Sequence, residues 1–261
     1  MNPGVDKIAH LGCKSLNLVF YKFRSSGLWR LLRRVGFLRR GLYLAIELRR
    51  SWREPWTSTV GVVDRDFTDR NDPWKYETNP MEHARFAQQT ELLDEVRKGG
   101  LFKSGLEIGC AEGRYTETLA ERCESLLVLD LSPTALARAQ SRRRWPERVR
   151  FAAFDLRREV VPGTFDLIVV AGVLEYFSRP STLRRIRENL IAALRPNGYL
   201  LVETSRWNPI VENAWWGRRL IRGKWINALV SEHPSLTVVS SVMTDSYSIV
   251  LCRKLGSDWA Q

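Results

Sequence analysis

One segment of the chain combines glycines, a turn and two carboxylates in an order that suits a nucleoside cofactor. Residues 105–113 read G-L-E-I-G-C-A-E-G, an apolar run that ends in a glycine-punctuated turn, and a helical pattern starts at Arg114. A second apolar run ends in Asp130. This order predicts a strand, a loop that a ligand can approach closely, a helix, and a second strand that ends in a carboxylate. An ordinary strand-to-helix turn also contains glycines, so that alternative stays open here.

The spacing of the glycines favours one class of cofactor. A pyrophosphate site typically reads G-x-G-x-x-G, because its middle glycine lets the backbone reach the phosphates. Here Ala111 holds that position, and the pattern is E-x-G-x-x-x-G, from Glu107 through Gly109 to Gly113. S-adenosylmethionine has no phosphate, and its positive centres and ribose hydroxyls suit Glu107 and Asp130. We therefore expect S-adenosylmethionine as the cofactor.

The remaining apolar patterns predict an α/β fold with a Rossmann-like, doubly wound, seven-stranded and mainly parallel sheet. Strand patterns alternate with an amphipathic helix, and the chain ends in an antiparallel hairpin. In such sheets, ligands bind beyond the carboxyl ends of the strands. The predicted strands and helix lie at 149–155, 162–172, 183–194 (helix), 199–204, 236–243 and 246–253.

Residues 106–204 resemble a class I S-adenosylmethionine-dependent methyltransferase, and the final hairpin fits that fold. Residues 72–85 are similar to the entry segment of the nodulation-protein S family, which N-methylates chitooligosaccharides. Residues 109–113, 116–123 and 130–138 resemble the same family. The resemblance implies that the entry segment covers the cofactor. The chain departs from the family after the fourth strand, where residues 171–177 lack the usual serine and acid, so the amino-sugar acceptor does not carry over.

The predicted cofactor contacts come from these strand ends and from the entry segment, where Tyr76 is a further candidate. An acid at the end of the third strand can accept from the adenine amino group, which is the role expected for Asp155. Trp74 could instead be a buried anchor, and Cys110 a small apolar spacer. The predicted cofactor-binding residues are Trp74, Arg85, Glu107, Gly109, Cys110, Gly113, Asp130, Leu131, Asp155, Leu156 and Ala171.

Two residues just beyond the fourth strand are the catalytic candidates. Glu175 or Tyr176 could remove a proton from the acceptor. For Glu175 the favoured alternative is a carboxylate at a helix N-terminus or in the cofactor shell. Methyl transfer depends mainly on holding donor and acceptor in contact, so a base is needed only for a protonated acceptor.

Cysteine and histidine positions predict neither a disulfide framework nor a metal site. The four cysteines and three histidines are scattered along the chain. We expect reduced thiols, a cytoplasmic protein and no bound metal. The residues are Cys13, Cys110, Cys123, Cys252, His10, His83 and His233.

The positive charge is concentrated at the N-terminus. Residues 1–53 carry twelve Lys/Arg and two Asp/Glu, a net +10 of the total +12. Leucines at helical spacing between residues 28 and 46 form a stripe opposite several arginines, which predicts a basic amphipathic appendage over 1–63 and a methyltransferase domain over 64–261. The appendage could bind an anionic membrane surface, peripherally at the inner membrane, or its apolar stripe could pack on the catalytic domain or a partner subunit. Nucleic acid is a less favoured partner.

Two classes of function remain from the sequence. The first is a methyltransferase that acts on an oxygen or nitrogen of a carbohydrate, a lipid-linked compound or another specialised small molecule. The second is a non-catalytic binding or scaffold protein on a degenerate methyltransferase fold with a membrane-surface arm. The intact set of Glu107, Gly109, Gly113, Asp130 and Asp155 favours the enzyme.

Overall fold

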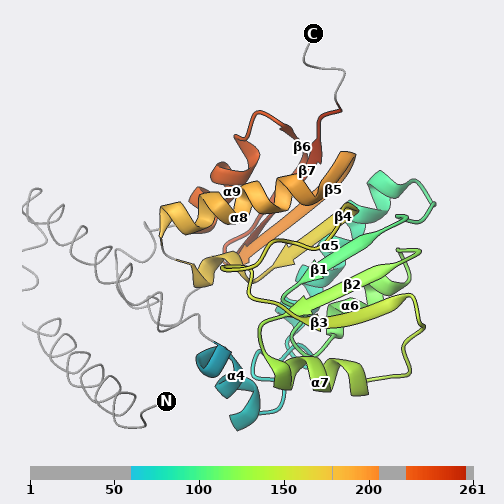
Figure 1. The fold of residues 1–261 in the computed structure, drawn as a ribbon, viewed down its shortest axis with the longest axis vertical. Coiled ribbons are helices and arrows are strands. Elements are labelled where there is room, and N and C mark those ends of the chain that lie inside the picture. Colours follow the sequence, from blue (N-terminus) through green and yellow to red (C-terminus); the bar gives the residue numbers. More distant parts are fainter. Residues whose placement is uncertain (1–59, 178, 206–221, 257–261) are drawn as a thin grey trace, which may run out of the picture. The chain divides into compact units, whose positions relative to one another are not determined.

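The computed structural model describes residues 60–256, except residue 178 and residues 206–221. These residues form one seven-stranded sheet in the order β3-β2-β1-β4-β5-β7-β6, drawn in Figure 1. The first five strands are parallel, and β7 runs antiparallel to both β5 and β6. The strands are β1 Gly105–Ile108, β2 Leu126–Asp130, β3 Val149–Ala153, β4 Phe165–Ala171, β5 Leu194–Ser205, β6 Leu236–Met243 and β7 Tyr247–Lys254. The predicted fold class and final hairpin are confirmed.

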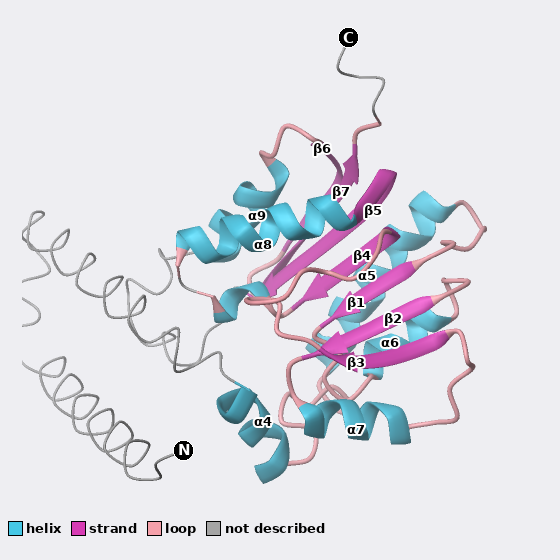
Figure 2. Cartoon of the chain, viewed as in Figure 1, coloured by secondary structure: helices cyan, strands magenta, loops and turns pink. Residues whose placement is uncertain are grey.

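Helices cover both faces of the sheet, as Figure 2 shows. The helices are α4 Val60–Asp69, α5 Pro80–Arg97, α6 Arg114–Ala120, α7 Pro133–Ser141, the 3₁₀ turn η1 Leu174–Tyr176, α8 Pro180–Ala193 and α9 Arg222–Ser231. None of these described helices combines the length and apolar character of a membrane span. The proposed boundary between residues 63 and 64 falls inside α4, and residues 1–59 lie outside the described part of the chain, so the division into two domains stays a prediction.

Alternate side chains of β5 divide the core into two layers. Leu200 and Val202 pack with α8 and α9, whereas Leu201 packs with α5 and α6 on the other face. Because side chains alternate along a strand, Glu203 belongs to the face of Leu201, which is covered by α5. An acid therefore occupies a core position at the carboxyl end of β5.

Several predicted boundaries differ from the structure by a few residues, among them those of β5 and β3. β5 begins at Leu194, which pairs with Phe165 across an irregular register, so residues 194–198 join the strand that was expected to start at 199. β3 ends at Ala153, because its ladder with β2 ends where Asp130 pairs with Ala153. Asp155 consequently lies two residues beyond its strand instead of at the strand end.

Candidate active site

The turn after β1 has a backbone that most side chains would not permit. Gly109 and Gly113 have φ angles of 84° and 78°, in the left-handed region, and Ala111 between them has φ 49°. A Cβ atom on Gly109 would also overlap Cγ2 of Val173. The glycines thus bring the backbone of residues 109–113 directly against its neighbours.

Asp130, at the end of β2, holds this turn in place. Its Oδ2 accepts a hydrogen bond from the Ala111 backbone N–H at 2.8 Å, and its Oδ1 accepts one from the Ser132 N–H at 2.8 Å. The side chain is buried, and burial raises the pKa of Asp130 to about 6 although these backbone donors lower it. One carboxylate therefore links the loop after β1 to the start of α7.

Glu107, in β1, is a second buried carboxylate. Its Oε2 accepts a hydrogen bond from the Thr116 hydroxyl at 2.6 Å. Burial raises the pKa of Glu107 to about 7, and the nearby negative charge of Asp130 raises it further, while the bond from Thr116 opposes the shift. At neutral pH this side chain is poised between its neutral and charged forms, so a bound cation would favour the carboxylate.

A cavity opens between the loop after β1, the end of β4 and the start of α5. It is lined by one basic side chain, Arg85, by one acidic side chain, Glu107, and by aromatic rings from the entry segment, α5 and α6. The Phe86 and Tyr115 rings stack with their centroids 5.1 Å apart, and the Tyr76 ring is 5.4 Å from that of Phe86. The lining residues are Tyr76, Arg85, Phe86, Glu107, Ile108, Gly109, Cys110, Tyr115, Val169 and Ala171. The cavity brings together five of the predicted cofactor contacts.

Arg85 is fixed from two sides. Its Nη1 donates to Oε2 of Glu203 at 2.5 Å, and its Nη2 lies 2.5 Å from Oε2 of Glu82. The guanidinium carbon is 5.7 Å from the centroid of the Tyr76 ring. Arg85 is itself buried, so these partners offset the cost of removing its charge from water.

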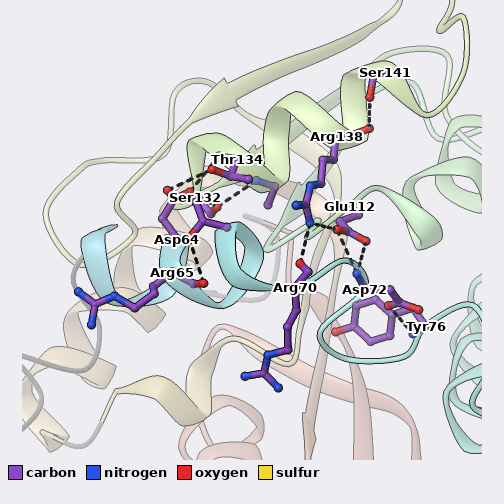
Figure 3. A network of polar contacts seen from close by, with 12 residues as sticks. Asp64, Arg65, Arg70, Asp72, Tyr76, Glu112, Ser132, Thr134, Arg138 and Ser141 are labelled. Carbon is purple, nitrogen blue, oxygen red and sulfur yellow. Dashed lines mark hydrogen bonds and ion pairs between the residues drawn. The ribbon is translucent and has the colours of Figure 1, made fainter.

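The segment before α5 is tied to the cofactor loop by polar contacts, shown in Figure 3. Glu112, in the loop, accepts hydrogen bonds from the Asp72 backbone N–H and from Arg138 of α7. Asp64, in α4, accepts from Ser132 and from both the N–H and hydroxyl of Thr134. The segment that the sequence placed over the cofactor thus lies against the loop that would hold it.

Other predicted residues lie elsewhere or have different partners. Trp74 is 38% exposed, so it is not a buried anchor, and its contact with the cofactor stays a prediction. The Asp155 carboxylate accepts from the Arg157 backbone N–H at 3.0 Å and pairs with the Arg157 guanidinium at 3.1 Å. Leu156 is buried in the core layer of α8 and α9, and Leu131 directly follows β2. The adenine contact of Asp155 stays a prediction.

The two catalytic candidates, Glu175 and Tyr176, and the thiol of Cys110 are restrained by their surroundings. Oε1 of Glu175 accepts from the Ser205 N–H at 3.0 Å, which joins η1 to the end of β5. Burial raises the pKa of Tyr176 far above its ordinary value, so its hydroxyl stays protonated at neutral pH. Burial likewise raises the pKa of the Cys110 thiol, which fits the spacer interpretation and not a reactive thiolate.

Sequence reasoning did not single out Phe86, Tyr115 or Glu203. The first two are aromatic positions in α5 and α6, where the sequence does not separate a cavity wall from ordinary core. Glu203 did leave a signal, because an acid ends the apolar run 199–202 at the sheet edge where ligands bind. Among the described residues, no group of three His, Cys, Asp or Glu side chains could hold a metal ion.

This combination of fold and site defines a class I S-adenosylmethionine-dependent methyltransferase. A family model described as Nodulation protein S (NodS) matches residues 59–247, and the chain belongs to that family. The N-methyltransferase NodS from Bradyrhizobium japonicum WM9, solved in complex with S-adenosyl-L-homocysteine, has a TM-score of 0.62 at 31% identity, and the match covers 76% of this chain and 98% of that one. S-adenosylmethionine is therefore the cofactor of this family and fold.

Curated relatives match over a shorter stretch. Nodulation protein S of Rhizobium tropici is 37% identical over 136 residues, which are 52% of this chain and 56% of that protein. Ubiquinone biosynthesis O-methyltransferase of Pseudomonas paraeruginosa is 27% identical over 150 residues, or 54% of this chain and 58% of that protein. The chain thus spans a little over half the length of these relatives.

Replacing Gly109 by alanine should destabilise the protein by about 2 kcal/mol or more, because alanine is strained at this φ angle and its Cβ would overlap Val173. Thermal or denaturant unfolding measures the change. Gly61→Ala is the control, since that helical glycine has open space around it and alanine favours helices. Equal stability of the two variants would contradict the loop geometry.

Glu107→Gln should stabilise the ligand-free protein increasingly as pH rises from 5 to 8. The pKa of Glu107 is about 7 when folded against an ordinary 4.5, so the folded state retains a proton that the unfolded state releases. Stability from this group is complete below pH 4.5 and lost as pH rises through 7, up to about 3 kcal/mol. Unfolding free energies across this range check it, with the exposed Glu124→Gln as control. A pH-independent difference would refute it.

Proposed function

We propose that this protein transfers a methyl group from S-adenosylmethionine to a nitrogen or oxygen of a carbohydrate, a lipid-linked compound or another specialised small molecule. The observation that carries the proposal is the cavity at the carboxyl ends of β1 and β4. It combines a guanidinium, a carboxylate and the backbone of the loop after β1, which is the chemistry needed for a zwitterionic amino-acid group. The membership of the NodS family and the intact loop support an enzyme over a scaffold protein.

The side chains present fit the cofactor. The oxygens of Asp130 accept backbone hydrogen bonds from Ala111 and Ser132, and the Leu131 N–H also acts on this carboxylate. Because a carboxylate has about four lone-pair sites, it can also accept from a ribose hydroxyl. In the cavity, Arg85 suits the cofactor carboxylate, and Glu107 suits its ammonium group. Asp155 would accept from the adenine amino group, as its place after β3 suggests.

When bound, the cofactor supplies a methyl group made electrophilic by the positive sulfur. The protein holds the cofactor in position and keeps water away from the methyl group. The rings of Tyr76, Phe86 and Tyr115 line the cavity, exclude water and present faces that attract a cation. Arg85, held by two carboxylates, orients the amino-acid end, so that donor and acceptor remain in contact.

Glu175 is the residue best placed by sequence to accept a proton from the acceptor. Its bond from the Ser205 N–H holds the carboxylate at the ends of β4 and β5. Tyr176 would act as a hydrogen-bond donor, because the raised pKa keeps its hydroxyl protonated. Nitrogen is favoured as the acceptor atom, since the solved NodS relative is an N-methyltransferase at 31% identity, whereas the O-methyltransferase relative is at 27%.

Asp130→Ala should weaken the binding of S-adenosylhomocysteine by roughly 1–3 kcal/mol, or about five- to 150-fold, because a charge-assisted hydrogen bond to the ribose is lost. Isothermal titration calorimetry measures the affinity. The control is Glu147→Ala, an exposed acid before β3 at the opposite edge of the sheet. If the wild-type protein binds no S-adenosylhomocysteine, the proposed function is wrong, and no transfer of a labelled methyl group to amine or hydroxyl acceptors is expected.

We also propose that residues 1–53 bind an anionic membrane surface from the cytoplasmic side, on the strength of their net charge of +10. The full chain should float with vesicles that contain anionic lipid, and less so at high salt, because screening weakens the attraction. Flotation of a variant with four arginines changed to serine should fall. Equal flotation of both proteins, or of neither, would discard the proposal. The four positions are Arg30, Arg33, Arg34 and Arg40.

A further inference from the structure

Three acidic side chains and one arginine lie close together at the carboxyl end of β5. Arg85 bonds both Glu203 and Glu82, at 2.5 Å each. The negative charge of Glu175, in η1, also acts on Glu203. Arg85 can balance the charge of one of these acids. Burial, Glu175 and Glu82 raise the pKa of Glu203 to about 8 although Arg85 lowers it, so excess negative charge develops in the cluster as the pH rises.

Glu203 lies directly behind the wall of the cavity. Its strand neighbour in β4 is Ala171, which lines the cavity, and its bonded partner Arg85 lines it too. On its other side β7 pairs with it through Ile249. The neighbouring strands fix the backbone of Glu203, and the bond from Arg85 holds its carboxylate behind the cavity wall.

The Glu203 side chain is incompletely satisfied. It has no exposed surface, and Oε1 has no hydrogen-bond partner among the described residues. Burying a carboxylate with an unpartnered oxygen is costly. A positive charge on a nearby ligand would therefore stabilise the ionised form of Glu203. Glu107, on the cavity wall, adds a further acid to the same space.

The methyl donor and its product differ in charge at one atom. S-adenosylmethionine has a positive sulfonium, whereas S-adenosylhomocysteine has a neutral thioether. A buried negative charge acts over several ångströms in a poorly polarisable interior, so it stabilises the first and is nearly indifferent to the second. We propose that the Glu203 carboxylate makes this cavity selective for the positively charged methyl donor over its neutral product. The proposal rests on the methyl-transfer function proposed above.

The same geometry predicts a pH dependence. Burial raises the pKa of Glu203, and Glu175 and Glu82 raise it further, while Arg85 opposes the shift. Tyr76 from the entry segment and Tyr247 from β7 also face this carboxylate. Selectivity for the cation is therefore complete at alkaline pH and declines as the pH falls and Glu203 takes up a proton.

Sinefungin tests the proposal, because an amine-bearing carbon replaces its sulfonium and keeps the positive charge. Calorimetry should give a ratio of the S-adenosylhomocysteine Kd to the sinefungin Kd that falls about tenfold in Glu203→Gln, mostly through weaker sinefungin binding. The exposed Glu188→Gln should leave the ratio unchanged. Equal weakening of both ligands would mean that Glu203 only positions Arg85, and would overturn the proposal.

Two further measurements protect the test against a variant that does not fold. Glu82→Gln removes the other acid that bonds Arg85 and should also lower the ratio. In the wild-type protein the ratio should decline from pH 8.5 to pH 6. Because Glu107 titrates in the same range, this decline should be smaller in Glu203→Gln, and a constant ratio or an equal decline in the two proteins would refute the proposal. Failure of the wild type to bind either ligand would instead refute the proposed function, so the two failures are distinguishable.

Discussion

The site depends on one buried carboxylate that accepts from two backbone segments. Asp130 receives the Ala111 N–H from the loop after β1 and the Ser132 N–H from the turn before α7. Without it, two buried N–H groups would lack partners, and the left-handed loop would lose the contact that holds it against the sheet. The glycines permit the loop's conformation, but the carboxylate selects it. Gly109 and Cys110, which line the cavity, are also held by backbone bonds to Leu129 of β2.

The opposite wall is organised by a second buried charge. Arg85 is buried and forms ion pairs with Glu82 and Glu203. The pair with Glu203 joins the start of α5 to the end of β5. The cavity therefore lies between two electrostatic anchors, one on each side of β1 and β4. Because both anchors are shielded from water, their charges act strongly on any ligand between them. Burial also raises the pKa values of Glu107 and Asp130. Because buried charges act strongly, the site can discriminate between ligands that differ in charge.

The entry segment completes the arrangement by covering the loop from outside. Glu112 and Arg138 fasten it near Asp72, and Asp64 fastens α4 to the start of α7. These contacts are polar and partly exposed, unlike the apolar layers that hold the sheet. The entry segment is therefore held by these polar contacts together with a small apolar cluster, in which Phe67 packs against Ala111 and Ala135.

The sequence by itself determined the fold class, the cofactor loop and the acid at the end of β2, because these depend on local patterns. Periodic apolar runs specify strands and helices. Positive φ angles favour glycine, so the positions of the glycines in the sequence indicate the loop. Only the tertiary structure decided which distant residues meet. Arg85 and Glu203 are 118 residues apart, and no local pattern encodes their pairing. Strand register placed Asp155 beyond β3 and extended β5 back to Leu194, since hydrogen bonds to neighbouring strands, not propensity, set where each strand ends.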